Sequence, residues 1–263
     1  MAGLSPGDLE ALARAKKTLE NPGLAIRIAD AAGRPVEALV RSLPEGAQRA
    51  IQAGTRRALS ASLGVALRTL DRRAVPASDW LHRGAVAVTG AVGGATGLPG
   101  LLVELPVSLT VMLRSIADNA RAQGEDLSQV ASRLECLAVF AYGSRSATDD
   151  ASDASYFATR AVLARAVAEA AEFVAGRGVT EALGDKGAPA ILQLLARIAQ
   201  RLGVSVTEKV AAQLVPLVGA LGGAAINTLF IHHFQETARS HFTVRRLERD
   251  CGADRVREAY DAA

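Results

Sequence analysis

The residues best suited to chemistry in this chain stand together in the stretch HHFQETARSH, residues 232–241. On a helix, His232 lies one turn before Glu236, and His233 lies three residues before it, so either histidine can approach the carboxylate. Imidazole nitrogens and a carboxylate are ligands that zinc and related metals accept. A helical metal site also needs ligands from a second helix, and the sequence offers no further HxxE or ExxH pair. A metal site is therefore a hypothesis beside a polar helix face with local His–Glu hydrogen bonds, the reading we favour.

The opposite face of the same helix is predicted to be apolar, and it includes two polar residues. This face carries Asn227, Phe230, Ile231, Phe234, Ala238, His241 and Phe242. His232, His233 and Glu236 are predicted to point away from it. Buried polar groups in proteins are nearly always hydrogen-bonded. We therefore expect His241 to be a hydrogen-bonded core histidine, and Asn227 to satisfy backbone groups at a kink or a tightly packed seam.

A second set of charged residues surrounds an apolar run. Glu104 stands between Val103 and Leu105, and Arg114 and Asp118 follow at a spacing of one helical turn, with Arg121 also in reach of Asp118. One hypothesis is a carboxylate of raised pKa in a pocket. The other, which we favour, is an ion network that joins helices, because a buried charge needs a partner to offset its desolvation.

The sequence shows no recognisable nucleophile or cofactor loop. The GxSxG pattern is absent, and Ser108 and Ser115 have no histidine or aspartate at a fixed spacing. Cys136 stands in an apolar stripe and Cys251 has no neighbouring histidine to activate it. The glycine-rich run at residues 86–97 lacks GxGxxG spacing, a P-loop lysine and βαβ alternation. We therefore predict no catalytic residue and no cofactor, which favours a non-catalytic protein.

Two long uncharged stretches, residues 84–103 and 210–235, admit two interpretations. They have the length of a membrane span, but glycine, proline and polar residues reduce their hydrophobic gain. GAVGGA in the first stretch returns as GALGGA in the second, and small residues four apart allow helices to pack closely. The helix-packing glycines are Gly90, Gly93, Gly94, Gly97, Gly219, Gly222 and Gly223. We favour two Gly-rich apolar helical hairpins packed at the centre of the protein, with Pro99 and Pro106 turning or kinking the chain. Whether the hairpins insert in a bilayer stays open.

The composition predicts an all-α, multi-helix bundle in a single domain over residues 1–263. The chain is 49% hydrophobic but only 4% aromatic, and no segment alternates with the period of a strand. Ser5-Pro6 is a typical helix start, and a stripe from Ile51 to Leu67 predicts a buried helix face. The small and acidic residues 143–155 predict a surface loop. A helix is expected to end at Gly203, with Ser205 opening the last long apolar element.

The charge balance, 30 Lys plus Arg against 27 Asp plus Glu, gives +3. Basic and acidic residues are interleaved, so the pattern argues against nucleic acid as a partner. The arginines at 245, 246 and 249 form a charged helix face that could reach lipid phosphates. The N-terminal residues lack the apolar core of a signal peptide, and the two cysteines are far apart. These features favour a cytoplasmic location.

Nearly the whole chain resembles the EcsC family. The most specific run is GALGGAAINTLFIHHFQETARSHFTVRRLER, followed by the pattern C-G-x-x-x-V-x-x-x-Y at Cys251, Gly252, Val256 and Tyr260. LENPGLAIRIADAAGRPVE and LPGLLVELPVSLTVMLRSIADNARAQGEDL resemble the family as well. The resemblance implies a bacterial helical protein, cytoplasmic or peripheral to a membrane, of a family named after a gene beside an ABC exporter. It implies no particular reaction.

Three functional hypotheses follow. The first is a non-catalytic accessory protein at the inner face of the cell membrane or on a membrane transport complex. The second is a carrier or sensor that binds a lipid-like ligand between the hairpins. The third, least favoured, is a metal-dependent enzyme built on His232, His233 and Glu236. The sequence does not indicate an oligomeric state.

Overall fold

The computed structural model describes residues 3–20, 24–32, 35–71, 97–144, 156–184, 188–213 and 219–263. Within these ranges every regular element is a helix, which confirms the all-α prediction. The helices are α1 (Pro6–Glu20), α2 (Leu24–Ala32), α3 (Val36–Arg41), α4 (Glu45–Thr69), α6 (Gly97–Ala122), α7 (Val130–Tyr142), α8 (Tyr156–Arg177), α9 (Val179–Gly184), α10 (Pro189–Gln213), α11 (Gly219–Cys251) and α12 (Ala253–Ala262).

Local sequence signals account for several helix ends. At the start of α1 the Ser5 hydroxyl accepts the Asp8 N–H at 3.2 Å, while the Ser5 N–H donates to the Asp8 carboxylate at 3.1 Å. This reciprocal pair is a capping box, and Pro6 fills the first helical position, where its missing N–H costs nothing. After α6, Gly124 takes a positive φ of 78°, a conformation that glycine adopts without strain.

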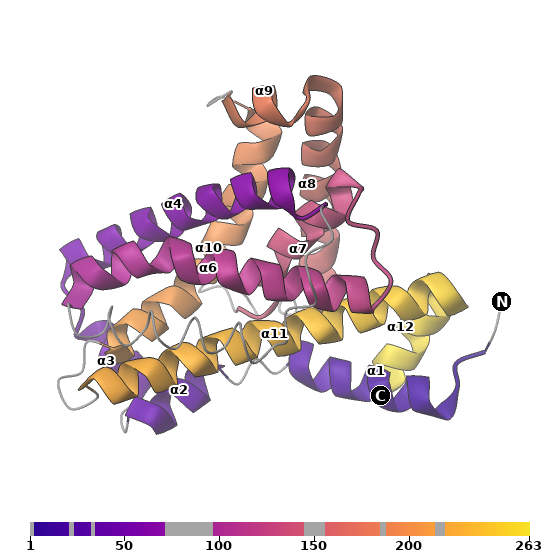
Figure 1. Cartoon of the computed structure of the whole chain (residues 1–263). Helices are drawn as coiled ribbons and strands as arrows, with labels where there is room; N and C mark the ends of the chain where they lie inside the picture. Colours follow the sequence, from indigo (N-terminus) through magenta and orange to yellow (C-terminus); the bar gives the residue numbers. More distant parts are fainter. Residues whose placement is uncertain are drawn as a thin grey trace.

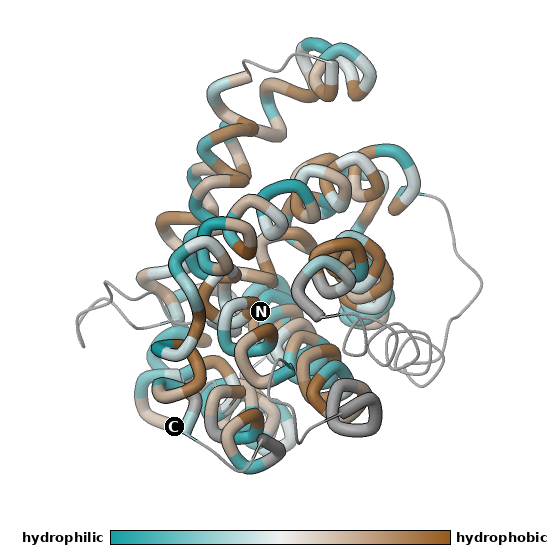
Figure 2. The backbone as a smooth tube through the Cα atoms, turned by 90° about the vertical axis from the view of Figure 1, so that its left-hand side faces the viewer, coloured by the Kyte–Doolittle hydropathy of each residue, from teal (hydrophilic) through white to brown (hydrophobic). Residues whose placement is uncertain are grey.

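α11, the longest of the described helices, packs against helices from both ends of the chain. Figure 1 shows α4, α6 and α11 running across the view as successive layers, with α8 and the first part of α10 standing steeply against them. α11 contacts α1, α2, α6, α7, α10 and α12, and α12 folds back from its end to meet α1. Hydrophobic and hydrophilic residues alternate around each helix (Figure 2), as amphipathic helices require. The stripe from Ile51 to Leu67 is buried on α4 as predicted.

One predicted helix end is wrong, because α10 continues through Gly203 to Gln213. Pro99 and Pro106, which were predicted to turn or kink the chain, both lie within α6, so neither ends the helix. An internal glycine costs a helix only about 1 kcal/mol relative to alanine, and Leu202 and Val206 on either side of Gly203 are fully buried. Packing of the flanking turns therefore outweighs the local propensity.

Only the first two residues of the predicted surface loop at about residues 143–155 belong to the described ranges. Gly143 and Ser144 are buried, and residues 145–155 lie outside the described ranges. The Ser144 hydroxyl is 2.9 Å from the hydroxyl of Ser205 on α10. Small polar residues are typical of loops, but they also fit where two helices approach closely.

The predicted glycine seam cannot be followed through the structure. Gly90, Gly93 and Gly94 lie outside the described residues, Gly97 is the first residue of α6, and Gly219, Gly222 and Gly223 lie in the first two turns of α11. The central Gly-rich hairpins therefore stay a prediction. None of the described helices is both long and apolar enough to cross a membrane.

The contact between α4 and α6 generates a prediction about Gly54 and Gly64, two glycines of α4. A Cβ at Gly54 would lie 2.7 Å from the Leu102 side chain on α6, whereas one at Gly64 would meet nothing within 4 Å. Gly64→Ala should raise the free energy of unfolding by roughly 0.5–1 kcal/mol through helix propensity. Gly54→Ala should gain less or destabilise, because Leu102 must move. Equal effects in chemical denaturation would show that α4 and α6 are not this close.

Candidate functional site

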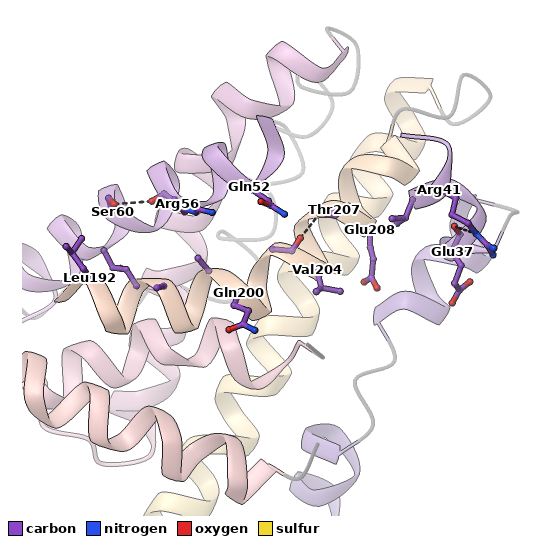
Figure 3. A pocket seen from close by; sticks show the side chains of 15 residues that line it. Glu37, Arg41, Gln52, Arg56, Ser60, Leu192, Gln200, Val204, Thr207 and Glu208 are labelled. Atoms are coloured by element: carbon purple, nitrogen blue, oxygen red, sulfur yellow. Dashed lines mark hydrogen bonds between the residues drawn. The ribbon is translucent and has the colours of Figure 1, made fainter. Parts of the chain in front are cut away.

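A groove of about 1040 Å³ lies between α3, α4 and α10. Its apolar wall comes from α10, where Leu192, Leu195, Ala199 and Val204 line it. Figure 3 shows that the labelled members of this wall extend along the helix from Leu192 at one end to Glu208 at the other. Sequence reasoning missed this groove because a space between helices depends on how they pack, which no local pattern encodes.

The opposite wall, on α4, is polar. Gln52, Arg56 and Ser60 line it and are spaced four residues apart, so they form one stripe along the helix (Figure 3). The Ser60 hydroxyl donates to the Arg56 carbonyl at 3.0 Å, a bond within the helix that leaves the arginine side chain in the groove wall. The groove therefore has one apolar and one hydrogen-bonding side, as ligand sites for amphiphiles require.

One end of the groove holds two carboxyl groups, Glu208 of α10 and Glu37 of α3. Burial of Glu208, assisted by the negative charge of Glu37, raises the pKa of Glu208 to about 7. Arg41 is near the same end, but its Nε donates to the backbone carbonyl of Glu37 at 3.2 Å. Among the described residues no ion pair involves either carboxylate. The sequence signal for Glu208 was available, since it is an acid within the largely apolar run VSVTEKVAAQ.

Glu104 lies in the core and not in this groove. It is buried and forms an ion pair with Lys209 of α10, Nζ to Oε1 3.2 Å, and the Ser108 hydroxyl donates to the same carboxylate. Lys209 is only 1% exposed, and its Nζ lies 5.1 Å from the centre of the Phe230 ring. Burial lowers the pKa of Lys209, which the Glu104 charge partly offsets. The arrangement joins α6, α10 and α11.

Asp118 is paired with Arg121, the second of the two arginines expected within its reach. Its carboxylate accepts from Arg121 at 2.8 Å, three residues on, whereas Arg114 is exposed. Arg121 also donates to the Leu70 carbonyl at 2.6 Å, which draws its side chain towards the end of α4. Because Glu104 and Asp118 stand almost four helical turns apart on α6, these charges do not form one network.

The two adjacent histidines of α11 point in different directions. His232 lies 3.3 Å from Glu236, which also accepts from Arg27 of α2 at 3.1 Å. His233 is buried and its Nε2 lies 2.6 Å from the Gly143 carbonyl, to which it donates; burial lowers the pKa of His233 to about 4. The prediction that His233 faces away from the core is wrong, because α11 is enclosed on most sides. No three His, Cys, Asp or Glu side chains in the described part of the chain gather as metal ligands.

His241 lies at the centre of a buried polar network, and Asn227 is also fully buried on the same helix. The Tyr156 hydroxyl is 2.8 Å from His241 Nδ1, and His241 Nε2 is 3.0 Å from the Glu135 carboxylate. Tyr142 donates to the same carboxylate at 2.7 Å. The consistent assignment is a neutral imidazole that accepts from Tyr156 and faces an ionised Glu135 with its Nε2–H.

The pKa values of this network support that assignment. Burial alone would raise the pKa of Glu135, but His241, the Arg245 charge and the Tyr142 hydroxyl outweigh it and lower the pKa to about 2. Burial lowers the pKa of His241, which keeps the ring neutral. The members of the network are almost fully buried, so it acts on the packing of α7, α8 and α11.

The arginines near the end of α11 already have partners within the chain. Arg245 and Arg249 both pair with the buried carboxylate of Glu125. Arg246 donates to the Gln123 side chain at 3.0 Å and lies within 3.5 Å of Asp8. A guanidinium held in this way gives up an internal bond if it turns to a lipid phosphate.

The fold and the groove define an all-α protein with a ligand-sized groove between α3, α4 and α10. The EcsC protein family matches residues 7–247, and the chain belongs to this family. No curated protein and no solved structure matches it.

The Glu104–Lys209 pair generates a stability prediction. Lys209→Met should cost about 3–5 kcal/mol of unfolding free energy, because it leaves a buried carboxylate without its cation. Adding Glu104→Gln should recover much of that loss, because the uncompensated charge is removed. Arg165→Met, which breaks the exposed pair with Glu169, is the matched control and should change little. A Lys209→Met variant as stable as this control would contradict the pairing.

The low pKa of Glu135 predicts how stability depends on pH. The pKa of Glu135 is about 2 in the folded state and about 4.3 in the unfolded chain. The ionised carboxylate therefore stabilises the fold fully above the unfolded pKa, and this contribution is lost as the pH falls towards the folded pKa. Glu135→Gln should be less stable at neutral pH and should lose less stability on acidification, whereas exposed Glu10→Gln should follow the parent protein. Parallel curves of unfolding free energy for the parent and Glu135→Gln would refute the linkage.

Proposed function

We propose that this protein is a non-catalytic carrier or sensor that binds a lipid-like ligand in the groove between α3, α4 and α10. The observation that carries the proposal is the groove itself, whose volume is about 1040 Å³. Ligand sites are concave, largely apolar and supplied with a few polar groups. The groove differs in place from the inter-hairpin site expected from the sequence, but it has the same chemical character.

The shape of the groove favours a long chain over a compact ligand. The wall from Leu192 to Glu208 extends about 24 Å along α10 at about 1.5 Å per residue. Leu192 is half exposed although it is apolar, so a hydrocarbon chain along this wall would remove it from water. Each buried methylene contributes about 0.8 kcal/mol, which favours an extended alkyl chain.

We further propose that the protein collects its ligand at the inner face of the cell membrane, by peripheral contact or as part of a membrane transport complex. Membership of the EcsC family and the apolar wall of the groove support this setting. The third hypothesis, a metal enzyme, gains no support at His232, His233 and Glu236. His233 is turned into the core, and Arg27 lies beside Glu236.

Lipid uptake can be tested with a variant that fills the groove. Gly203 lines the groove and a Cβ there would meet nothing within 4 Å, so Gly203→Phe places a ring in the cavity without a backbone clash. We expect native mass spectrometry to find lipid on the parent protein after incubation with phospholipid and lysophospholipid liposomes. Occupancy should fall at least about tenfold in Gly203→Phe, a loss of about 1.4 kcal/mol.

Gly176→Phe, at an exposed glycine of α8 with open space around it, is the matched control and should keep the lipid. Flotation of the same mixtures reports membrane contact, which we expect to be partial and weakened by salt. A parent protein that carries no lipid, or equal occupancy in both variants, would overturn the proposal.

A further inference from the structure

The end of the groove at Glu208 and Glu37 holds two carboxyl groups for which the described residues supply no ion pair. Glu208 is half-buried at the end of the apolar wall, and Glu37 supplies a second negative charge from α3. A ligand chain in the groove would exclude more water from Glu208. A carboxylate that loses its water must gain a cation or a proton.

The charged groups around Glu208 come from four helices. Arg41 of α3 and Arg56 of α4 line the groove with it, but neither forms an ion pair with it. α2 also packs on α10, and its Arg27 is bound to Glu236 while Asp30 is exposed. The next residue, Lys209, is directed into the core towards Glu104. Within the described ranges, the protein therefore leaves the charge of Glu208 for a ligand to neutralise.

We propose that the ligand is a single-chain amphiphile whose head group carries an ammonium ion, seated between Glu208 and Glu37. This inference rests on the proposed lipid-binding function and specifies its ligand. The alkyl chain lies along α10 towards Leu192, and a phosphate attached to the head group would face Arg41 or Arg56. At the position between Glu208 and Glu37 an anionic group would be repelled by the two carboxylates, whereas an ammonium ion offsets both, and Arg41 and Arg56 line the groove outside that position.

The same geometry makes binding depend on pH. The pKa of Glu208 is raised to about 7, so the carboxyl group is mostly ionised above that pH and mostly neutral below it. An ammonium ligand therefore binds more tightly at high pH. It in turn lowers the pKa of Glu208, because binding and ionisation are linked.

The test compares three probes with the same alkyl chain: dodecyltrimethylammonium, dodecylphosphocholine and dodecanoate, each below its micelle-forming concentration. Calorimetric titration of the full chain at about pH 8.5 and about pH 5.5 brackets the pKa of about 7 for Glu208. The two ammonium probes should bind roughly tenfold more tightly at the higher pH, equivalent to about one unit of pKa change in the bound state. Dodecanoate should bind more weakly at the higher pH.

Three charge variants and the groove-filling Gly203→Phe variant separate the possible outcomes. Glu208→Gln should abolish the pH dependence and weaken both ammonium probes, and Glu37→Gln should lower the pH at which binding strengthens. Glu172→Gln, at an exposed position of α8, should behave as the parent. If all probes bind but dodecanoate binds as tightly as dodecyltrimethylammonium at high pH, the ammonium inference fails and the groove function stands. If no probe binds, or Gly203→Phe binds them as well as the parent, both fail.

Discussion

The fold depends on one constraint: α11 is enclosed on most sides, and its buried polar side chains need partners from other helices. His233 donates to the carbonyl of Gly143 after α7, and the Gln235 amide donates to the Ser115 hydroxyl of α6 at 2.8 Å. His241 meets Tyr156 of α8. Because these partners come from distant parts of the sequence, each bond fixes one more helix against α11, and a shift of any of them leaves a buried group unsatisfied.

α10 connects this core to the groove. Adjacent residues on a helix point about 100° apart, so Lys209 can enter the core towards Glu104 while Glu208 faces the groove. The ion pair with Glu104 ties α10 to α6, which holds the apolar wall in place before any ligand arrives. A preformed wall lowers the conformational cost of binding. One side of α10 therefore lines the groove, while its other side packs against the core.

Local and periodic features of the fold could be predicted from the sequence, whereas features of packing could not. The capping box at Ser5 and Asp8 depends on residues three apart, and the buried stripe of α4 depends on helical period. The continuity of α10 through Gly203 depends on burial of its neighbours in three dimensions. The inward turn of His233 arises because α11 is enclosed, although its polar residues resemble a solvent-facing side. The groove, and the position of Glu208 in it, depend on how three helices meet, although Glu208 was visible in the sequence as an acid within an apolar run.

The buried and half-buried carboxyl groups differ in one physical respect, which is whether the fold supplies them with a partner. Glu104 has Lys209, Glu125 has Arg245 and Arg249, and Glu135 has His241 and Tyr142. These partners offset the cost of burial, and they lower the pKa of Glu125 and Glu135. Glu208 has no such partner among the residues that the structure describes, and burial with Glu37 nearby raises its pKa instead. The fold neutralises these three buried acids internally. It leaves Glu208 at the end of an apolar groove, where a cation from outside the protein can reach its charge.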